Sequence, residues 1–276
     1  MPGFADAKKM SQLNSLSAFF YFLGGKVMDL GEYIGGLSIL AVKTLFSIFR
    51  NFFNYRDTVS QFDLVGIKSS SLTNLIGVFT GMVLAVQFIV GLKRFGLQLY
   101  TGQIIGIAIT RELGPVLTAL MVAARVGSGI AAELGSMSVN EQILAIEAMG
   151  GDPIKKLVVP RVLATTICTP ILTILADFIG ILGGMLITMS ETGVGMRYYL
   201  DQISNTVEVS DLMGGLGKTF FFGFFIGIIA CYQGLNTRGG TAGVGRATTM
   251  SVVYASIGIF VSDFFLTKLF IFLFSA

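Results

Sequence analysis

Long apolar segments alternate with short polar connections along the chain. A helix that crosses a bilayer needs about 20 predominantly apolar residues. Stretches with few or no charges predict five such helices, Ser69–Leu92, Phe95–Ala124, Val162–Ser190, Thr219–Thr237 and Thr248–Phe270. Some of these spans carry ionisable residues inside the apolar run, namely Arg111, Glu112, Asp177 and Asp263. The pattern predicts an all-α integral membrane protein whose few internal charges face other helices, a partner subunit or a polar cavity.

A further apolar stretch, Ile34–Phe52, has a different pattern. Its apolar residues recur at helical spacing along one side, and the opposite stripe holds Lys43, Ser47, Arg50 and Asn54. This amphipathic pattern favours a helix that lies in the membrane surface. The alternative is a sixth span, which would have to bury the charge of Lys43.

Basic residues predict the orientation of the spans. If the N-terminus and the connections 125–161 and 238–246 are cytoplasmic, 13 of the 19 basic residues lie on that side, in agreement with the positive-inside rule. Arg111 is then intramembrane, and the outer side holds Lys93, Arg94, Arg197, Lys218 and Lys268. The C-terminus faces outward, as an odd number of spans requires.

Composition supports the membrane class and argues against enzymatic chemistry. The chain is 53% hydrophobic and 13% charged, against about 25% charged residues in soluble domains. The net charge of +3 does not indicate nucleic-acid binding. The sequence has no histidine, the commonest general base and metal ligand. We therefore expect no catalytic residue, no metal site and no cofactor.

The segment Gly214–Thr219 resembles the end of a phosphate-binding loop, G-x-x-x-x-G-K-[ST]. Leu212 stands where that motif requires its first glycine, and no predicted strand precedes the segment. We therefore expect no ATPase site in this chain.

The connection 124–162 predicts a short helix of its own. Ser138 and Glu141 have the spacing of a capping box, and Gly150-Gly151-Asp152-Pro153 is a strong helix stop. The helix between them carries the polar residues Glu141, Gln142 and Glu147 beside the apolar residues Ile143, Ile146 and Met149. It is either a turn that joins two spans or a docking helix for a cytoplasmic partner, and the residues alone favour neither.

Two further patterns concern contacts between spans. Asp177 and Asp263 stand alone in apolar runs, so each is expected to pair with an arginine or lysine from another span rather than to relay protons. Small residues also recur four apart, at Gly77/Gly81, Gly102/Gly106, Gly180/Gly184 and Gly223/Gly227. These pairs favour helix contacts within one subunit over a dedicated dimer face.

Several motifs, all in one order, closely resemble the MlaE family of ABC-transporter permeases. They are Gly81–Gln87, Arg111–Val116, Ala124–Ser128, Ala132–Gly135, Glu141-Gln142, Glu147–Met149, Asp152-Pro153, Pro160-Arg161 and Gly245–Thr249. The resemblance runs from about Leu72 to Phe270. Residues 1–60 match loosely, as an interfacial elbow helix, so we divide the chain into this region and a permease domain over residues 61–276.

The resemblance implies a homodimeric permease with an N-terminal elbow helix, five transmembrane helices and a cytoplasmic coupling helix. Its partners would be a second copy of the chain, a cytoplasmic ABC ATPase, a STAS-domain protein and a periplasmic MCE-domain protein. Such a permease moves phospholipid between the bacterial inner membrane and the MCE carriers, which maintains outer-membrane lipid asymmetry. The N-terminus would be cytoplasmic and the C-terminus periplasmic.

The family's lipid pocket falls on Leu84, Gln87, Leu92, Phe95, Arg111 and Glu112. Relatives can carry tyrosine where this chain has Phe95. The coupling helix falls on Glu141–Met149, with the contacts to the ATPase at Glu141, Gln142, Ile143, Ile146, Glu147 and Met149. We hypothesise that Arg111 is partnered by Glu112 or by a carboxylate across the dimer. Two rival functions are a proton-driven transporter that uses Asp177 and Asp263, and a scaffold that anchors a cytoplasmic complex.

Overall fold

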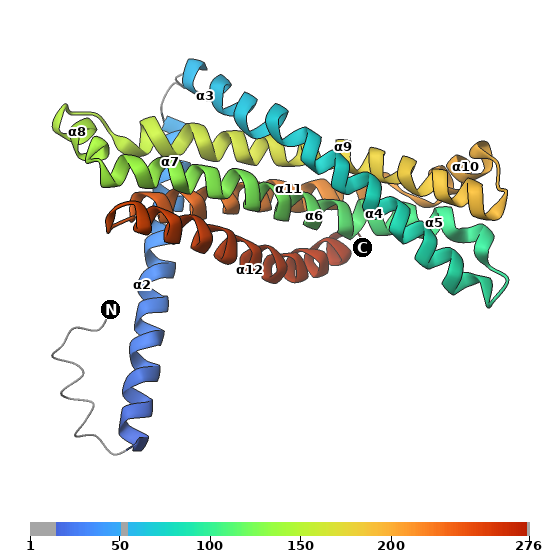
Figure 1. The fold of residues 1–276 in the computed structure, drawn as a ribbon, viewed down its shortest axis with the longest axis horizontal. Coiled ribbons are helices and arrows are strands. Elements are labelled where there is room, and N and C mark those ends of the chain that lie inside the picture. The colour runs from blue at the N-terminus through green and yellow to red at the C-terminus, as the bar shows by residue number, and fades with distance from the viewer. Residues whose placement is uncertain (1–14, 51–54, 275–276) are drawn as a thin grey trace.

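The computed structural model describes residues 15–50 and 55–274, which form helices joined by short turns (Figure 1). The α-helices are α2 (Ser15–Arg50), α3 (Tyr55–Phe62), α4 (Lys68–Lys93), α5 (Thr101–Ala108), α6 (Gly114–Val122), α7 (Ser128–Val139), α8 (Gln142–Ala148), α9 (Val159–Thr192), α10 (Met196–Thr206), α11 (Val209–Leu235) and α12 (Gly240–Phe274). The π-helical segments η1 (Asp63–Ile67), η3 (Ile109–Leu113) and η4 (Ala123–Gly127) join consecutive α-helices without a break. The π-helical segment η5 (Ile154–Val158) leads directly into α9, and the 3-10 turn η2 (Gln98–Tyr100) leads directly into α5.

The predicted spans coincide with long helices, which confirms a multi-pass, all-helical membrane protein. Five helical stretches long and apolar enough to cross a membrane match them, Thr58–Lys93, Gln98–Val139, Ile154–Thr192, Val209–Leu235 and Gly240–Leu273. The second continues well beyond Ala124, as expected, and the fourth begins at Val209 rather than at Thr219. A sixth stretch of this length and composition, Gly24–Phe49, belongs to α2.

The long helices lie side by side along one axis, and this arrangement gives the molecule two distinct ends (Figure 1). The short helix α8 lies at one end, and α10 lies at the other. Helix α2 runs across the axis of the bundle near the α8 end. α10 was not predicted from the sequence, because its polar, amphipathic residues resemble those of an ordinary connection.

Helix α2 contacts the bundle along one side only. Tyr33 packs against Tyr232 and Tyr254, with ring centroids 5.3 and 4.8 Å apart, and its hydroxyl accepts a hydrogen bond from Gln233 Nε2 at 3.0 Å. Leu40 and Thr44 are buried on the same side. Of the predicted apolar stripe, Ile34 and Leu45 are exposed, and Ser47 of the opposite stripe is half-buried. The location of this helix in the membrane surface stays a prediction. Residues 51–54, with Phe52 and Asn54, lie outside the described residues.

Paired glycines allow α4 and α9 to pack with their backbones in contact. A Cβ atom at Gly77 would lie 2.8 Å from the carbonyl oxygen of Ala176, and one at Gly81 would overlap the carbonyl oxygen of Gly180. Gly223 on α11 packs in the same way against the backbone of α9. All of these partners belong to the same chain, which confirms the prediction of contacts within one subunit.

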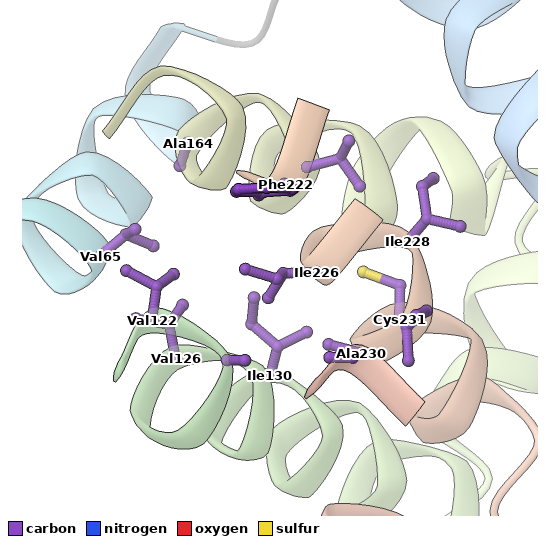
Figure 2. Packing of buried hydrophobic residues seen from close by; sticks show 14 of the residues in the cluster. Val65, Val122, Val126, Ile130, Ala164, Phe222, Ile226, Ile228, Ala230 and Cys231 are labelled. Atoms are coloured by element: carbon purple, nitrogen blue, oxygen red, sulfur yellow. The ribbon is translucent and has the colours of Figure 1, made fainter. Parts of the chain in front are cut away.

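The apolar core lies where η4, α7, α9 and α11 meet (Figure 2). Its largest members include Val122, Ile130, Phe222 and Ile226, each less than 3% exposed. Figure 2 shows Ile226 of α11 between Val126 and Ile130 of the η4–α7 stretch and Phe222 of its own helix. Lipid tails are as apolar as these side chains, so close packing rather than exclusion of water holds the helices together. This core fixes α11 against the second span, and the charged site lies farther along the same two elements.

Candidate functional site: a charged cleft and helix α8 at the end of the bundle

The second span departs from α-helical geometry where its charges lie. Arg111 and Glu112 belong to the π-helical segment η3, which ends at Gly114-Pro115. In an α-helix the amide of residue 115 would bond to the carbonyl of Arg111, but proline has no N–H. Lys218 Nζ of α11 donates to that carbonyl instead, at 3.1 Å. The proline thus frees an acceptor inside the bundle, and a lysine from another span satisfies it.

Arg111 is paired within its own chain. Its Nε donates to Asp211 Oδ1 of α11 at 2.6 Å. The Asp211 carboxylate is 6% exposed and the Arg111 side chain 54% exposed. Asp211 also forms a capping box with Glu208 at the start of α11. The hypothesis that Arg111 pairs with Glu112 is therefore wrong within the chain, because two residues adjacent in a helix point in different directions. A contact of Arg111 with a carboxylate across a dimer stays a prediction.

Glu112 instead pairs with a lysine that is almost completely buried. Lys218 Nζ lies 2.9 Å from Glu112 Oε2 and 3.2 Å from Asp263 Oδ1 of α12, and its side chain is 4% exposed. Thr267 Oγ1, also on α12, donates to Glu112 Oε1 at 3.2 Å. A buried lysine requires such partners, because removing a charge from water is expensive. The prediction that Asp263 pairs with a cation from another span is confirmed.

Lys218 was predicted to precede the fourth span, but it lies inside the apolar stretch Val209–Leu235. The segment Gly214–Thr219, which resembles a phosphate-binding loop, is part of the same continuous helix α11. Gly215 lets α11 approach η3 closely, because a Cβ atom there would overlap the carbonyl oxygen of Thr110. Gly215 therefore allows close helix packing, and Lys218 forms ion pairs with the carboxylates of Glu112 and Asp263.

These ion pairs form the wall of an open cleft. The cleft holds about 820 Å³ of open space between η3, α11 and the end of α12, and its lining includes Arg111, Glu112, Glu208, Asp211, Lys218, Phe270 and Ile271. The lining therefore combines charged and apolar side chains. A cleft of this kind suits an amphiphile, which carries a polar head and an apolar tail.

The remaining residues predicted for the lipid pocket lie elsewhere. Leu84 lines an apolar hollow with Phe79, Val83 and Leu113, on another face of η3. Gln87 and Phe95 are exposed, Leu92 is half-buried, and no described cavity joins these three to Arg111 and Glu112. Within one chain, the six predicted residues therefore divide into a charged pair at the cleft and a second set, mostly apolar, on α4 and the turn after it.

Asp177 has a different environment from Asp263. It is 7% exposed, and its Oδ1 has no hydrogen-bond partner. The carboxyl packs against Gly114, where any Cβ atom would overlap it. The expected ion pair is absent among the described residues, because the neighbouring turn of α6 offers backbone and no cation. Sequence could not show this, since it does not say which residue faces Asp177 across the interface.

The second candidate element is α8, which begins differently from the prediction. Ser138 does not cap it, because the Ser138 hydroxyl donates to the carbonyls of Leu235 and Thr237 at 3.2 and 3.3 Å. Glu141 adopts a left-handed conformation, with φ of 58°, and makes no capping hydrogen bond. The predicted capping box is therefore wrong, and α8 has two turns rather than three. Its stop at Gly150, with φ of 78°, is confirmed.

The two sides of α8 have distinct neighbours. Ile143 and Ile146 pack against the apolar core, so they anchor the helix to the bundle. Glu141, Gln142 and Glu147 are exposed, and Met149 is 79% exposed. Leu144, which was not singled out from the sequence, is 60% exposed on the open side. Leu144 and Met149 together therefore expose apolar surface at this end of the bundle.

A model of the permease MlaE family matches residues 58–269. The chain belongs to the MlaE permease family. It is 39% identical over 248 residues to a probable ABC transporter permease of Rickettsia bellii, an alignment that covers 90% of this chain and 96% of the relative. It is 34% identical over 252 residues to the intermembrane phospholipid transport system permease MlaE of Haemophilus influenzae, covering 91% and 97%. It is 35% identical over 237 residues to the chloroplast protein trigalactosyldiacylglycerol 1 of Arabidopsis thaliana, covering 85% and 68%.

Membership in the MlaE permease family confirms the resemblance found in the sequence. The matched region contains η3, α8, α11 and most of α12, so it includes the charged residues of the cleft, while Phe270 and Ile271 lie just beyond its end. The N-terminal helix α2 lies before it.

Proposed function

We propose that this chain is the membrane permease subunit of an ABC transporter that moves phospholipids between the bacterial inner membrane and periplasmic MCE-domain carriers. The Haemophilus relative, which covers nearly the whole chain, is named as a phospholipid transport permease. The observation that carries the proposal is the cleft, whose lining combines charged Arg111 and Glu112 with apolar Phe270 and Ile271. A phospholipid headgroup would contact the charged side chains of the lining, and its acyl chains would contact the apolar ones.

The same proposal includes a second copy of the chain. Leu84, Gln87, Leu92 and Phe95 lie on α4 or on the turn after it, outside the cleft. The outward face of α4 is strongly apolar, with Phe79 and Val83 each 57% exposed. We expect this face to complete the lipid pocket when two copies meet. Apolar residues there would contact acyl chains, and Gln87 would supply a polar contact.

The proposed orientation follows from charge and from the two ends of the bundle. The end with α8 would be cytoplasmic, because the basic residues Lys155 and Lys156 lie in η5, at the start of the third stretch on that side. Helix α2 would lie along the cytoplasmic membrane surface as an elbow helix, because it runs across the bundle and carries Lys43 on an exposed side (Figure 1). The C-terminus would be periplasmic.

The proposed energy source is a separate cytoplasmic ATPase, assisted by a STAS-domain protein. Helix α8 would dock into the ATPase through exposed Leu144, Glu147 and Met149, with Ile143 and Ile146 as its anchors. The hydrogen bonds from Ser138 to the end of α11 hold the base of α8. A push on α8 would therefore reach α11, which carries Asp211 and Lys218 at its other end.

Reversing the charge of Arg111 tests the role of the cleft. Arg111→Glu places a carboxylate beside Asp211, so we expect lipid transport to fall at least tenfold while membrane insertion is preserved. Transport of fluorescent phospholipid by the reconstituted complex measures the effect. Arg94→Glu, a reversal at an exposed arginine outside the cleft, is the matched control and should transport normally. Normal transport by Arg111→Glu would rule out the proposed role.

Charge reversal on α8 tests the docking helix. Glu147→Lys and Leu144→Asp should each abolish co-purification of the ATPase subunit, because the first reverses a charge on the exposed side of α8 and the second introduces one there. Glu191→Lys, at an exposed position near the opposite end of α9, should leave co-purification unchanged. Retention of the ATPase by both α8 variants would show that it docks elsewhere.

The lipids that co-purify with the detergent-solubilised complex, identified by mass spectrometry, separate a transporter from a scaffold.

A further inference from the structure

We propose that the corner between α2 and the start of η5 is a binding site for an anionic phospholipid that stays bound, separate from the transported lipid. Helix α2 contacts η5 directly. The corner is lined by Val42, Lys43, Phe46, Ser47, Asp152, Ile154 and Lys155. The proposal rests on the proposed position of α2 along the membrane surface, but it does not depend on lipid transport.

One part of this corner is basic. Lys43 and Lys155 are both exposed, and they come from elements that are far apart in the sequence. Asp152 is the acidic residue of the lining, and its carboxylate already has hydrogen-bond and ion-pair partners. Its Oδ1 accepts the amides of Ile154 and Lys155 at 3.0 and 3.4 Å, and its Oδ2 lies 3.6 Å from Lys155 Nζ. Two lysines against one occupied carboxylate leave a net positive corner.

The other part is apolar and continuous with the first. Val42, Leu45, Phe46 and Phe49 line a second hollow, which shares Val42 and Phe46 with the basic corner. Phe46 is 66% exposed and Phe49 is 88% exposed. These side chains lie on the side of α2 away from Leu40 and Thr44, which face the bundle. Large apolar residues grouped at an exposed site indicate a surface that contacts lipid or protein.

The joined hollows match the two chemical parts of a phospholipid. A phosphodiester accepts hydrogen bonds from lysine ammonium groups, and an acyl chain packs on phenylalanine and valine. A lipid whose headgroup carries only negative charge fits better than a zwitterionic one, because a headgroup cation would lie close to Lys43 and Lys155. Basic pockets at the cytoplasmic side of membrane helices are known to hold such lipids.

The absence of tryptophan from the sequence allows a direct test. Phe46→Trp introduces a single tryptophan into the site, and lipids with brominated acyl chains quench a tryptophan that they contact. In vesicles that contain the full chain, we expect brominated phosphatidylglycerol to compete for this position about tenfold better than brominated phosphatidylcholine. Phe49→Trp repeats the measurement at a second lining position, in case the first variant folds poorly.

Two variants make the result decisive. Adding Lys43→Glu and Lys155→Glu to Phe46→Trp should remove the preference for phosphatidylglycerol while quenching by both lipids continues. Phe178→Trp, at an exposed position on α9 distant in sequence from both lysines, should show no preference. Equal quenching at position 46, a preference that survives the two charge reversals, or no quenching by either lipid would each overturn the proposal. A failure of lipid transport would leave it standing.

Discussion

Replacing Lys218 with methionine is expected to destabilise the permease by roughly 3 kcal/mol, near the lower end for breaking a buried ion pair. The variant leaves Glu112 and Asp263 facing each other without a cation, and it removes the donor to the carbonyl of Arg111. Glu112 is 42% exposed, which keeps the expected loss moderate. Thermal unfolding in detergent measures it, and lipid transport should fall with it.

Neutralising the two carboxylates separates the ion pairs from simple loss of volume. Lys218→Met combined with Glu112→Gln and Asp263→Asn should regain most of the lost stability, because neutral amides do not repel each other. Lys93→Met, at an exposed lysine near the end of α4, is the matched control and should change stability by less than about 0.5 kcal/mol. If the triple variant is no more stable than Lys218→Met alone, the charges do not carry the effect.

Substitution of Gly81 by alanine should be equally disruptive, although it adds one methyl group. That methyl would overlap the carbonyl oxygen of Gly180, which is backbone and cannot rotate away. Overpacking of this kind typically costs about 1–3 kcal/mol, and a rigid neighbour places Gly81 at the upper end. We expect a lower unfolding temperature and a smaller yield of monodisperse protein by size-exclusion chromatography.

Gly91 provides the control on the same helix. A Cβ atom there would have no neighbour within 4 Å, so Gly91→Ala should leave packing unchanged. It should also stabilise α4 slightly, by about 0.5–1 kcal/mol, because alanine favours a helix more than glycine does. Similar losses for both variants would mean that helix propensity, and not contact with α9, decides the outcome.

The sequence predicted the elements that depend on composition within a short window. The spans follow from runs of apolar residues, because every backbone polar group in a bilayer must be satisfied within its own helix. The stop of α8 at Gly150 also follows from local chemistry, since glycine readily adopts the conformation that ends a helix. The resemblance to the MlaE permeases, carried by motifs such as Arg111–Val116, is likewise a property of residue order.

The same local signals failed where a distant residue competes for a group. Ser138 has the spacing of a capping residue, but the end of α11 offers carbonyl acceptors, and the hydroxyl bonds to them. Lys218 follows a glycine-rich turn pattern and seemed to lie outside the membrane, yet it is buried. The sequence did contain a signal for a buried lysine, because Asp263 lies in an apolar span and requires a cation from another helix.

The sequence by itself determined that this chain crosses a membrane several times and that Arg111 and Glu112 lie within a span. Only the tertiary structure decided the partners, Asp211 for Arg111 and Lys218 for Glu112, and left Asp177 without one. The physical reason is that hydrophobicity and backbone hydrogen bonding act within one helix. Ion pairs depend on which helix faces which, and close glycine contacts such as Gly81 with Gly180 set that arrangement.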